Sequence, residues 1–346
     1  MTKNRTYTLI ISLLFALSCA RNSGTERWQT DRDNIVDVAQ RIKCIDTKDV
    51  YISQMSTPYL VDKYLLITDY KSMDRLIHIF DKNTFRYVTS RINKGRGPAE
   101  IISIGNVTSS KQRGEIYVSD NGKQAIYTYS LDSLLKSNSY VPRLKLSHSK
   151  KYAIADYEYI NDTLSVGLAI VGLGSGDFKA SVVAINFETG DVEFMKYEHP
   201  DIVKPRFDYA ASLEHNIYVE SFAHHNLMTI CDLSGNLKYN IYGDGWSTEV
   251  SNENKFYGKT VICKDRIVAS FAGKERLFRR DDGSTGVNFP DKLIVFDIDG
   301  NYLKTLNLGH QIHRICYDEE GDRLIFSLQN DLHQFAYLEL DGLLNT

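Results

Sequence analysis

Short apolar runs separated by polar turns dominate the chain, and the clearest series lies between Leu65 and Glu100. Apolar or β-branched residues fill Leu65–Thr68 and Leu76–Phe80, and an aspartate follows each run. A third run, Phe85–Ile92, places apolar or aromatic residues at about every second position. No window long enough for a helix repeats its apolar residues with a helical period. The pattern therefore predicts three antiparallel strands, which cannot cover both of their faces by themselves.

The same pair of strands recurs along the sequence, with a period of roughly 40 to 65 residues. The clearest copy is Glu115–Asp132. The predicted pairs are Leu65–Thr68 with Leu76–Phe80, Ile116–Asp120 with Ala125–Tyr129, Thr163–Val171 with Ala180–Asn186, Asn216–Ser221 with Leu227–Asp232, Arg266–Phe271 with Lys292–Asp297, and Arg323–Leu328 with Phe335–Leu340. A period of this size is typical of a propeller or a solenoid, and a β-solenoid would need shorter, more uniform coils. The repeats favour six four-stranded blades around a central channel.

The N-terminal and C-terminal segments complement each other. The last blade has a first strand near Gln311–Tyr317 but ends one strand short, whereas Ile35–Ile45 is an unassigned strand before the first blade. We therefore predict an all-β fold, a six-bladed β-propeller whose ring is closed by an N-terminal strand. A ring of this kind leaves only short, protected strand edges.

The first residues carry the features of an export signal. Lys3 and Arg5 precede an apolar stretch, Thr8–Leu17, that is too short to span a bilayer permanently. Ser18 and Cys19 follow the stretch, and this arrangement resembles a bacterial lipoprotein signal, in which the cysteine is lipidated. The alternative is a secretory signal with an incidental cysteine. The predicted division is a signal peptide at 1–18, a flexible tether at 19–33 and the propeller at 34–346.

Composition limits the classes of partner. The formal net charge of −3 argues against general binding of nucleic acid or of anionic membrane surfaces. Four further cysteines, Cys44, Cys231, Cys263 and Cys316, show no C-x-x-C spacing. Cys231 and Cys316 are predicted to be buried strand residues, and one disulfide of undetermined pairing is compatible with an exported protein.

Candidate binding residues gather on loops that should share one face of the ring. Strand direction alternates within a blade, so loops between blades and loops between second and third strands emerge together. These loops carry Lys94, Arg96, His224, His225, Arg276, Arg279 and Arg280. Their basic character predicts an anionic or polar partner, and the alternative is a set of solvated loops and turns.

Other polar residues have simpler interpretations. Asp69 and Asp120 end matching strands and are predicted to accept hydrogen bonds from the next turn, with a shared channel metal as the alternative. The adjacent histidines His224 and His225 have no third ligand nearby in sequence, so no metal or cofactor is predicted. No catalytic motif is present, and no catalytic residue is assigned.

The export signal, the Leu65–Asp69 strands and the Gly95–Glu100 loop resemble the TolB-like six-bladed propeller lipoproteins, which are related in pattern to NHL-repeat propellers. The resemblance implies a lipid-anchored module of the periplasm or outer membrane, held to the membrane by its N-terminal lipid. We expect a monomer that binds a protein, peptide or glycan and no nucleic acid. The alternative is a propeller hydrolase or lyase with a channel metal, because propellers host both binders and enzymes.

Overall fold

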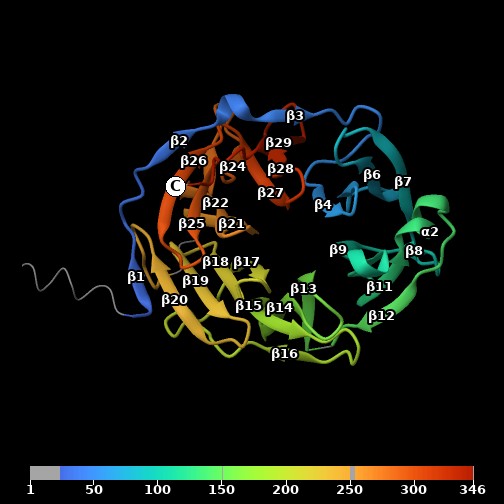
Figure 1. Cartoon of the computed structure of the whole chain (residues 1–346), viewed down its shortest axis with the longest axis horizontal. Coiled ribbons are helices and arrows are strands. Elements are labelled where there is room, and N and C mark those ends of the chain that lie inside the picture. Colours follow the sequence, from blue (N-terminus) through green and yellow to red (C-terminus); the bar gives the residue numbers. More distant parts are fainter. Residues whose placement is uncertain (1–23, 150, 250–253, 346) are drawn as a thin grey trace, which may run out of the picture.

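The computed structural model describes residues 24–149, 151–249 and 254–345, and it is built almost entirely of strands. Six sheets stand around a central channel as the blades of a propeller (Figure 1). The predicted signal peptide, 1–18, and Cys19 lie outside the described residues. The predicted fold class is confirmed.

Each blade begins at the channel and adds strands outward. Blades 1 to 3 are β4 (Thr57–Val61), β5 (Tyr64–Thr68), β6 (Arg75–Asp81), β7 (Tyr87–Lys94) with β8 (Glu100–Ile101); β9 (Ile104–Ser110), β10 (Glu115–Asp120), β11 (Ala125–Ser130), β12 (Arg143–Ser147); and β13 (Tyr152–Tyr159), β14 (Ser165–Gly174), β15 (Asp177–Ile185), β16 (Val192–Phe194). Blade 4 contains β17 (Phe207–Ser212), β18 (Ile217–Phe222), β19 (Leu227–Asp232) and β20 (Leu237–Tyr242). Blade 5 contains β21 (Asn254–Cys263), β22 (Arg266–Glu275), β25 (Lys292–Asp297) and β26 (Tyr302–Asn307). The first three strands of blade 6 are β27 (Gln311–Asp318), β28 (Arg323–Gln329) and β29 (Phe335–Glu339). Each of the six predicted strand pairs forms the second and third strands of a blade.

Hydrophobic clusters fill the interfaces between neighbouring blades. Between blades 6 and 1, for example, Ile325 and Phe335 pack with Leu65 and Ile67, and all four side chains are buried. Burial of this apolar surface is the main favourable term for the ring, about 25 cal/mol for each Å² removed from water. It explains why the second strand of a blade is apolar on both faces, since it contacts a neighbouring blade on each side.

The ring closes as the sequence predicts. The N-terminal strand β3 (Lys43–Ile45) pairs antiparallel with β29, placing Ile45 opposite Phe335, and so becomes the outermost strand of blade 6. The closing strand is shorter than the predicted Ile35–Ile45, because the 3-10 helix η1 (Ala39–Arg41) interrupts that segment. Ring closure therefore joins the first and last parts of the propeller in one sheet.

Strand β3 and the segment before it form a strap along blades 4, 5 and 6, which corrects the predicted tether and domain boundary. Strand β1 (Glu26–Trp28) pairs parallel with β20 of blade 4, and β2 (Ile35–Asp37) pairs parallel with β26 of blade 5. Figure 1 shows this strap, residues 24–45, following the outer rim of the ring. The described part of the tether segment, 24–33, therefore includes a strand of the propeller.

A buried ionic cluster joins blade 1 to blade 6 on the face of the ring opposite the inter-blade loops. Lys82 Nζ lies 3.1 Å from Asp318 Oδ1, and Arg323 Nε donates to Asp318 Oδ2 at 2.9 Å. Arg323 also donates to the backbone carbonyl of Lys82. All three side chains are at least nine-tenths buried. The Asp318 carboxylate thus pairs with both Lys82 and Arg323. These ion pairs offset much of the desolvation cost of burying the three charged groups.

The described cysteines are free thiols: Cys231 and Cys263 are buried, Cys316 is half-buried and Cys44 is exposed. The burial predicted for Cys231 is confirmed, whereas Cys316 is only partly covered. In the part of the chain that the structure describes, helix is limited to short segments such as α2 (Leu131–Lys136), which follows β11. In the described residues no helix has the length and apolar character needed to cross a membrane.

Candidate functional site

Two faces of the ring differ in the loops that they carry. Inter-blade loops and the turns between second and third strands emerge on one face, which we call the loop face. The first strands of all blades begin at this face and line the channel. A residue early in a first strand therefore lies near the mouth of the channel on the loop face, and a later residue lies deeper.

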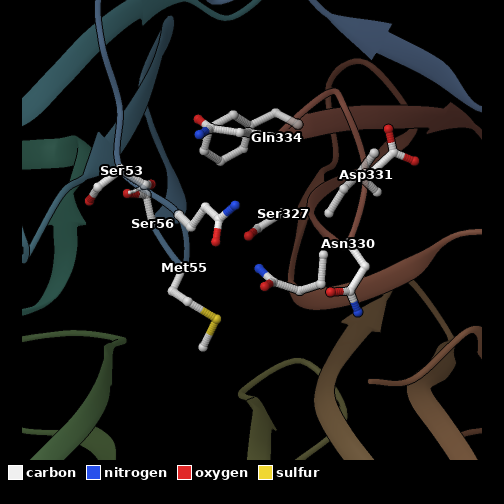
Figure 2. Close-up of a pocket in the computed structure, with 11 residues that line it drawn as sticks. Ser53, Met55, Ser56, Ser327, Asn330, Asp331 and Gln334 are labelled. Carbon is white, nitrogen blue, oxygen red and sulfur yellow. Dashed lines mark hydrogen bonds between the residues drawn. The ribbon is translucent and has the colours of Figure 1, made fainter. Parts of the chain in front are cut away.

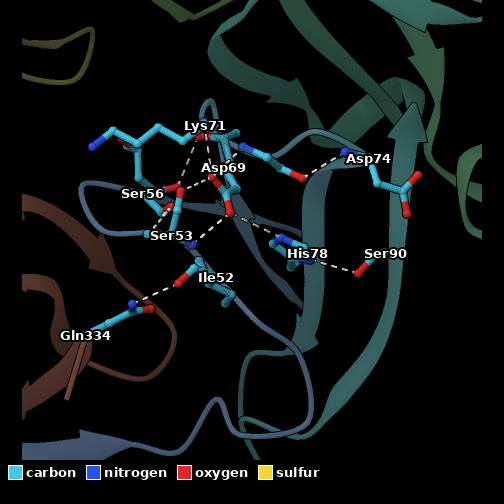
Figure 3. Close-up of polar contacts among 12 residues, drawn as sticks. Ile52, Ser53, Ser56, Asp69, Lys71, Asp74, His78, Ser90 and Gln334 are labelled. Carbon is cyan, nitrogen blue, oxygen red and sulfur yellow. Dashed lines mark hydrogen bonds and ion pairs between the residues drawn. The ribbon is translucent and has the colours of Figure 1, made fainter. Parts of the chain in front are cut away.

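Asp69 and Asp120 hold the turns of the loop face in place. The carboxylate of Asp69 accepts hydrogen bonds from the backbone N–H groups of Ser53, Lys71 and Ser72 at 2.8, 3.2 and 3.1 Å (Figure 3). Burial alone would raise the Asp69 pKa, but the His78 ring, whose Nε2 lies 3.8 Å from Oδ2, and hydrogen bonds from Ser53 outweigh it and hold the pKa at about 2. The structural role predicted for Asp69 is confirmed.

Asp120 does the same in blade 2. Its carboxylate accepts from the backbone N–H groups of Ile102 and Ser103 before the blade and of Gly122 and Lys123 after the strand. Both aspartates are buried and fully engaged by the backbone. Each one accepts hydrogen bonds from the following turn, as predicted, and also from the segment that leads into its own blade.

A small pocket lies beside the Asp69 network, between blades 1 and 6. Figure 2 shows Ser53, Met55 and Ser56 on one side and Ser327 and Asn330 on the other. Its volume is about 20 Å³, which is room for about one water molecule. Gln334 Nε2 donates to the carbonyl of Ile52 at 2.8 Å and spans the two blades (Figure 3).

The predicted loop-face residues occupy different settings. Lys94 Nζ contacts the sulfur of Met73 at 3.7 Å, and Arg96 is exposed in the loop after β7. The loop itself is organised by Glu100, whose carboxylate accepts from Gly97 N–H at 2.7 Å. Blade 1 thus presents Arg96 to solvent.

The two predicted histidines divide between surface and interior. His225 is buried, its Nδ1 lies 2.9 Å from the carbonyl oxygen of Ser247, and its ring packs against Phe222 and Trp246. Burial lowers the pKa of His225. His224 is half-buried. A partner on the loop face therefore cannot reach the His225 ring, and His225 has a packing role.

The predicted insertion of blade 5 forms a separate hairpin. Strands β23 (Leu277–Arg279) and β24 (Thr285–Val287) pair antiparallel outside the blade sheet. Arg276, Arg279 and Arg280 are exposed on this hairpin, beside the exposed side chains of Leu277, Phe278 and Val287. The structure therefore brings three of the predicted arginines together on one projection with apolar neighbours.

A charged network, which the sequence analysis missed, crosses the channel. Lys259 of β21 lies 3.0 Å from Asp208 of β17 and 3.3 Å from Asp156 of β13. Asp208 also lies 3.7 Å from Arg314 of β27. Burial alone would lower the Lys259 pKa, but Asp208 and Asp156 outweigh it and raise the pKa. Four blades therefore meet through alternating charges at the channel axis.

Nearer the mouth the charge becomes positive. Lys255, early in β21, is half-buried, and its Nζ lies 5.5 Å from the centre of the Phe289 ring. Burial lowers the Lys255 pKa, and repulsion from Arg276 and Arg314 lowers it further. Arg276 belongs to the insertion, so the predicted loop-face site and the channel mouth adjoin each other.

Deeper in the channel the lining becomes acidic. Glu158 of β13 is reached by water, yet the surrounding protein raises its pKa to about 7, with Lys259 opposing and Asp156 adding to the shift. This combination is expected for a carboxyl that faces a narrow channel, because water touches it while protein restricts its hydration. The channel thus has cations at its mouth and the Glu158 carboxyl deeper inside.

The sequence did contain a signal for this network. First strands consist mostly of uncharged residues, so charged residues within them need a reason. Lys255 and Lys259, for example, flank the aromatic pair of β21, and Asp208 lies between the two aromatic residues of β17. No spacing rule could have joined them, since the network members lie on separate blades. Among the described residues, no group of three or more His, Cys, Asp or Glu side chains is placed to hold a metal ion.

Solved structures resemble this protein at low sequence identity. A member of the DUF4221 family from Bacteroides vulgatus has 15% identity and a TM-score of 0.57, and the match covers 86% of this chain and 94% of that chain. The calcium-binding protein regucalcin from Agrobacterium tumefaciens has 10% identity and a TM-score of 0.54, with coverage of 88% and 94%. A protein from Bacteroides fragilis described as exported has 9% identity and a TM-score of 0.54, with coverage of 91% and 98%. These likenesses show the fold alone.

Comparison of sequences identifies the family. No curated protein matches the sequence. Residues 26–233 match the family model described as DUF5128, 6-bladed beta-propeller. The match begins at Glu26, the first residue of β1, so it includes the strap as well as the blades that follow. The chain therefore belongs to the DUF5128 family of six-bladed β-propellers.

Proposed function

We propose that this protein is a lipid-anchored binding module of the cell envelope that recognises an acidic segment of a protein through its loop face. The observation that carries the proposal is the β23–β24 hairpin, which combines exposed arginines with exposed Leu277, Phe278 and Val287. Aromatic residues and arginine are enriched at the centres of protein interfaces. Apolar side chains of this kind favour a protein partner over a glycan, and the arginines favour an acidic one.

The proposed location rests on the N-terminal motif. An apolar stretch followed by Ser18 and Cys19 resembles a lipoprotein signal, as in the TolB-like propeller lipoproteins. The similar propeller from Bacteroides fragilis is described as exported, which is consistent with an envelope location. Lipidation of Cys19 would tether the strap, and with it the ring, to a membrane surface.

Photo-cross-linking in intact cells tests the face that is used. A photoreactive amino acid replaces Phe278 on the hairpin or, as the control, Leu213 in the β17–β18 turn of the opposite face. Both positions are exposed, Phe278 by 38% and Leu213 by 53%. We expect a discrete protein adduct from position 278 that is lost after Arg279→Glu with Arg280→Glu, and no such adduct from position 213. Adducts from position 213 alone, or from neither position, would refute recognition through the loop face.

A further inference from the structure

We propose that the mouth of the channel is a carboxylate-binding subsite, in which Lys255, Arg276 and Arg314 receive a carboxylate of an acidic peptide segment lying across the loop face. The proposal deepens the proposed function and rests on it, because it assigns the chemistry of one group of the ligand. The carboxylate comes either from a Glu or Asp side chain or from the C-terminus of the segment.

The first argument is an imbalance of charge near the mouth. The mouth carries four cations, Lys255, Lys259, Arg276 and Arg314, and in the described residues the ion pairs among them are those of Lys259 with Asp156 and Asp208 and of Arg314 with Asp208. Lys259 contacts both carboxylates, and Arg314 reaches Asp208 only at 3.7 Å. The Arg314 side chain remains 37% exposed. The excess positive charge therefore faces the open mouth.

The second argument concerns Lys255 itself. Within the part of the protein that the structure describes, its ammonium group forms no ion pair, although the side chain is half-buried. Arg276 and Arg314 are close enough to repel it, and burial adds to the cost. An arriving carboxylate would relieve both costs, because it supplies the missing opposite charge. Phe289, held by a backbone hydrogen bond to Gln311 Oε1 at 3.3 Å, forms the floor beneath the ammonium group.

The third argument is a contrast with neighbouring lysines. Lys274 stands directly opposite Lys255 on β22, and its Nζ lies 2.5 Å from Asp291 Oδ2. Lys264, in the turn that ends β21 on the opposite face, lies 2.9 Å from Asp322 Oδ1. The protein thus supplies a carboxylate for Lys274, the cross-strand neighbour of Lys255, and for Lys264 at the far end of the same strand. An unpaired cation in this position is better explained by a ligand that provides the partner.

Fluorescence anisotropy with a labelled hexaglutamate peptide tests the subsite, using the mature protein at low ionic strength. Lys255→Met should raise the Kd by about fivefold or more. Lys264→Met changes the net charge equally and should raise it by less than about twofold. Lys255→Gln provides a second variant, and circular dichroism verifies that each variant is folded. An amidated peptide distinguishes the two sources, since it loses affinity only if the C-terminal carboxylate enters the mouth.

The rate of chemical acetylation of Lys255 provides a second, direct test of the subsite. Lys255 is expected to react with an acetylating reagent, because its lowered pKa enlarges the neutral, nucleophilic fraction. Saturating hexaglutamate should slow acetylation of Lys255 severalfold and leave Lys264 unchanged, as followed by mass spectrometry. Equal Kd values for the Lys255 and Lys264 variants, failure of the peptide to bind, or an unprotected Lys255 would each overturn the subsite. The cross-linking contrast between positions 278 and 213 decides the proposed function separately.

Discussion

At the scale of single residues, the clearest consequence of burial is at Glu220. This glutamate of β18 is 4% exposed, and burial, with a smaller repulsion from Glu198, raises its pKa to about 8. The folded state therefore keeps a proton that the unfolded protein, with a pKa of 4.5, releases at lower pH. By linkage, Glu220 makes the protein lose stability as the pH rises from about 4.5 to about 8.

Replacing Glu220 by Gln should remove that loss. The neutral amide keeps the shape of the protonated acid, so Glu220→Gln should match wild type near pH 4.5 and be more stable at pH 8, by on the order of 1 to 3 kcal/mol. Urea unfolding at several pH values measures the difference. The exposed Glu188→Gln variant is the matched control and should follow wild type. Parallel pH profiles for wild type and Glu220→Gln would show that Glu220 is not protonated in the fold.

Residue roles were predictable where a local rule applies. Asp69 and Asp120 follow apolar strands and precede turns, a context in which aspartate bonds to backbone N–H groups. The role of Lys259 was not predictable, since its partners Asp156 and Asp208 lie on two other blades. His225 was misjudged because an adjacent pair of histidines gives no indication of which ring the fold covers.

At the scale of elements, the strap depends on edge pairing that leaves little trace in sequence. Strand β1 pairs parallel with β20, and the Trp28 ring stacks on Tyr242 with centroids 4.7 Å apart. Gln29 Nε2 also donates to the carbonyl of Gly300 in blade 5 at 2.7 Å. A strand of three residues has too few positions for an alternating pattern, so polar sequence there indicated a tether. The antiparallel repeats of the blades were predictable because each spans many residues.

Two truncations separate the parts of the strap. Deletion of residues 34–45 removes β2 and the closing strand β3, exposing the β29 edge, so we expect loss of the folded monomer and aggregation. Deletion of residues 20–33 removes β1 and the Trp28 contact, and it should lower the thermal midpoint by several degrees while the ring stays closed. Thermal unfolding followed by circular dichroism compares them. Equal midpoints for the two truncations would contradict closure by β3.

At the scale of the whole molecule, the proposed anchor and the ring should be separable. Cys19 precedes the strap, so Cys19→Ala should release the protein from membranes without changing its thermal midpoint. Fractionation of cells and unfolding of the purified variant measure the two effects. Cys19→Ser serves as a second variant with the same expectation. Membrane retention equal to that of wild type would place the anchor elsewhere in the protein.

At this scale the fold could be predicted from the sequence, because one strand pattern recurs six times. The ligand could not be predicted. Repetition specifies how blades pack, and every blade needs the same apolar second strand. The binding surface arises from departures from the repeat, such as the β23–β24 insertion, and from charged channel residues that blades 3 to 6 contribute. Such departures indicate a location on the ring but carry little information about the partner.

The central claim is that a basic loop face recognises an acidic protein segment. The most direct test is titration of the protein captured from position 278 against wild type and against the Arg279→Glu, Arg280→Glu double variant, at low and high ionic strength. Both arginines are exposed on a hairpin outside the blade sheets, so the variant should fold normally. We predict at least about tenfold weaker binding and a smaller salt dependence for the variant. Unchanged affinity together with unchanged salt dependence would contradict the claim.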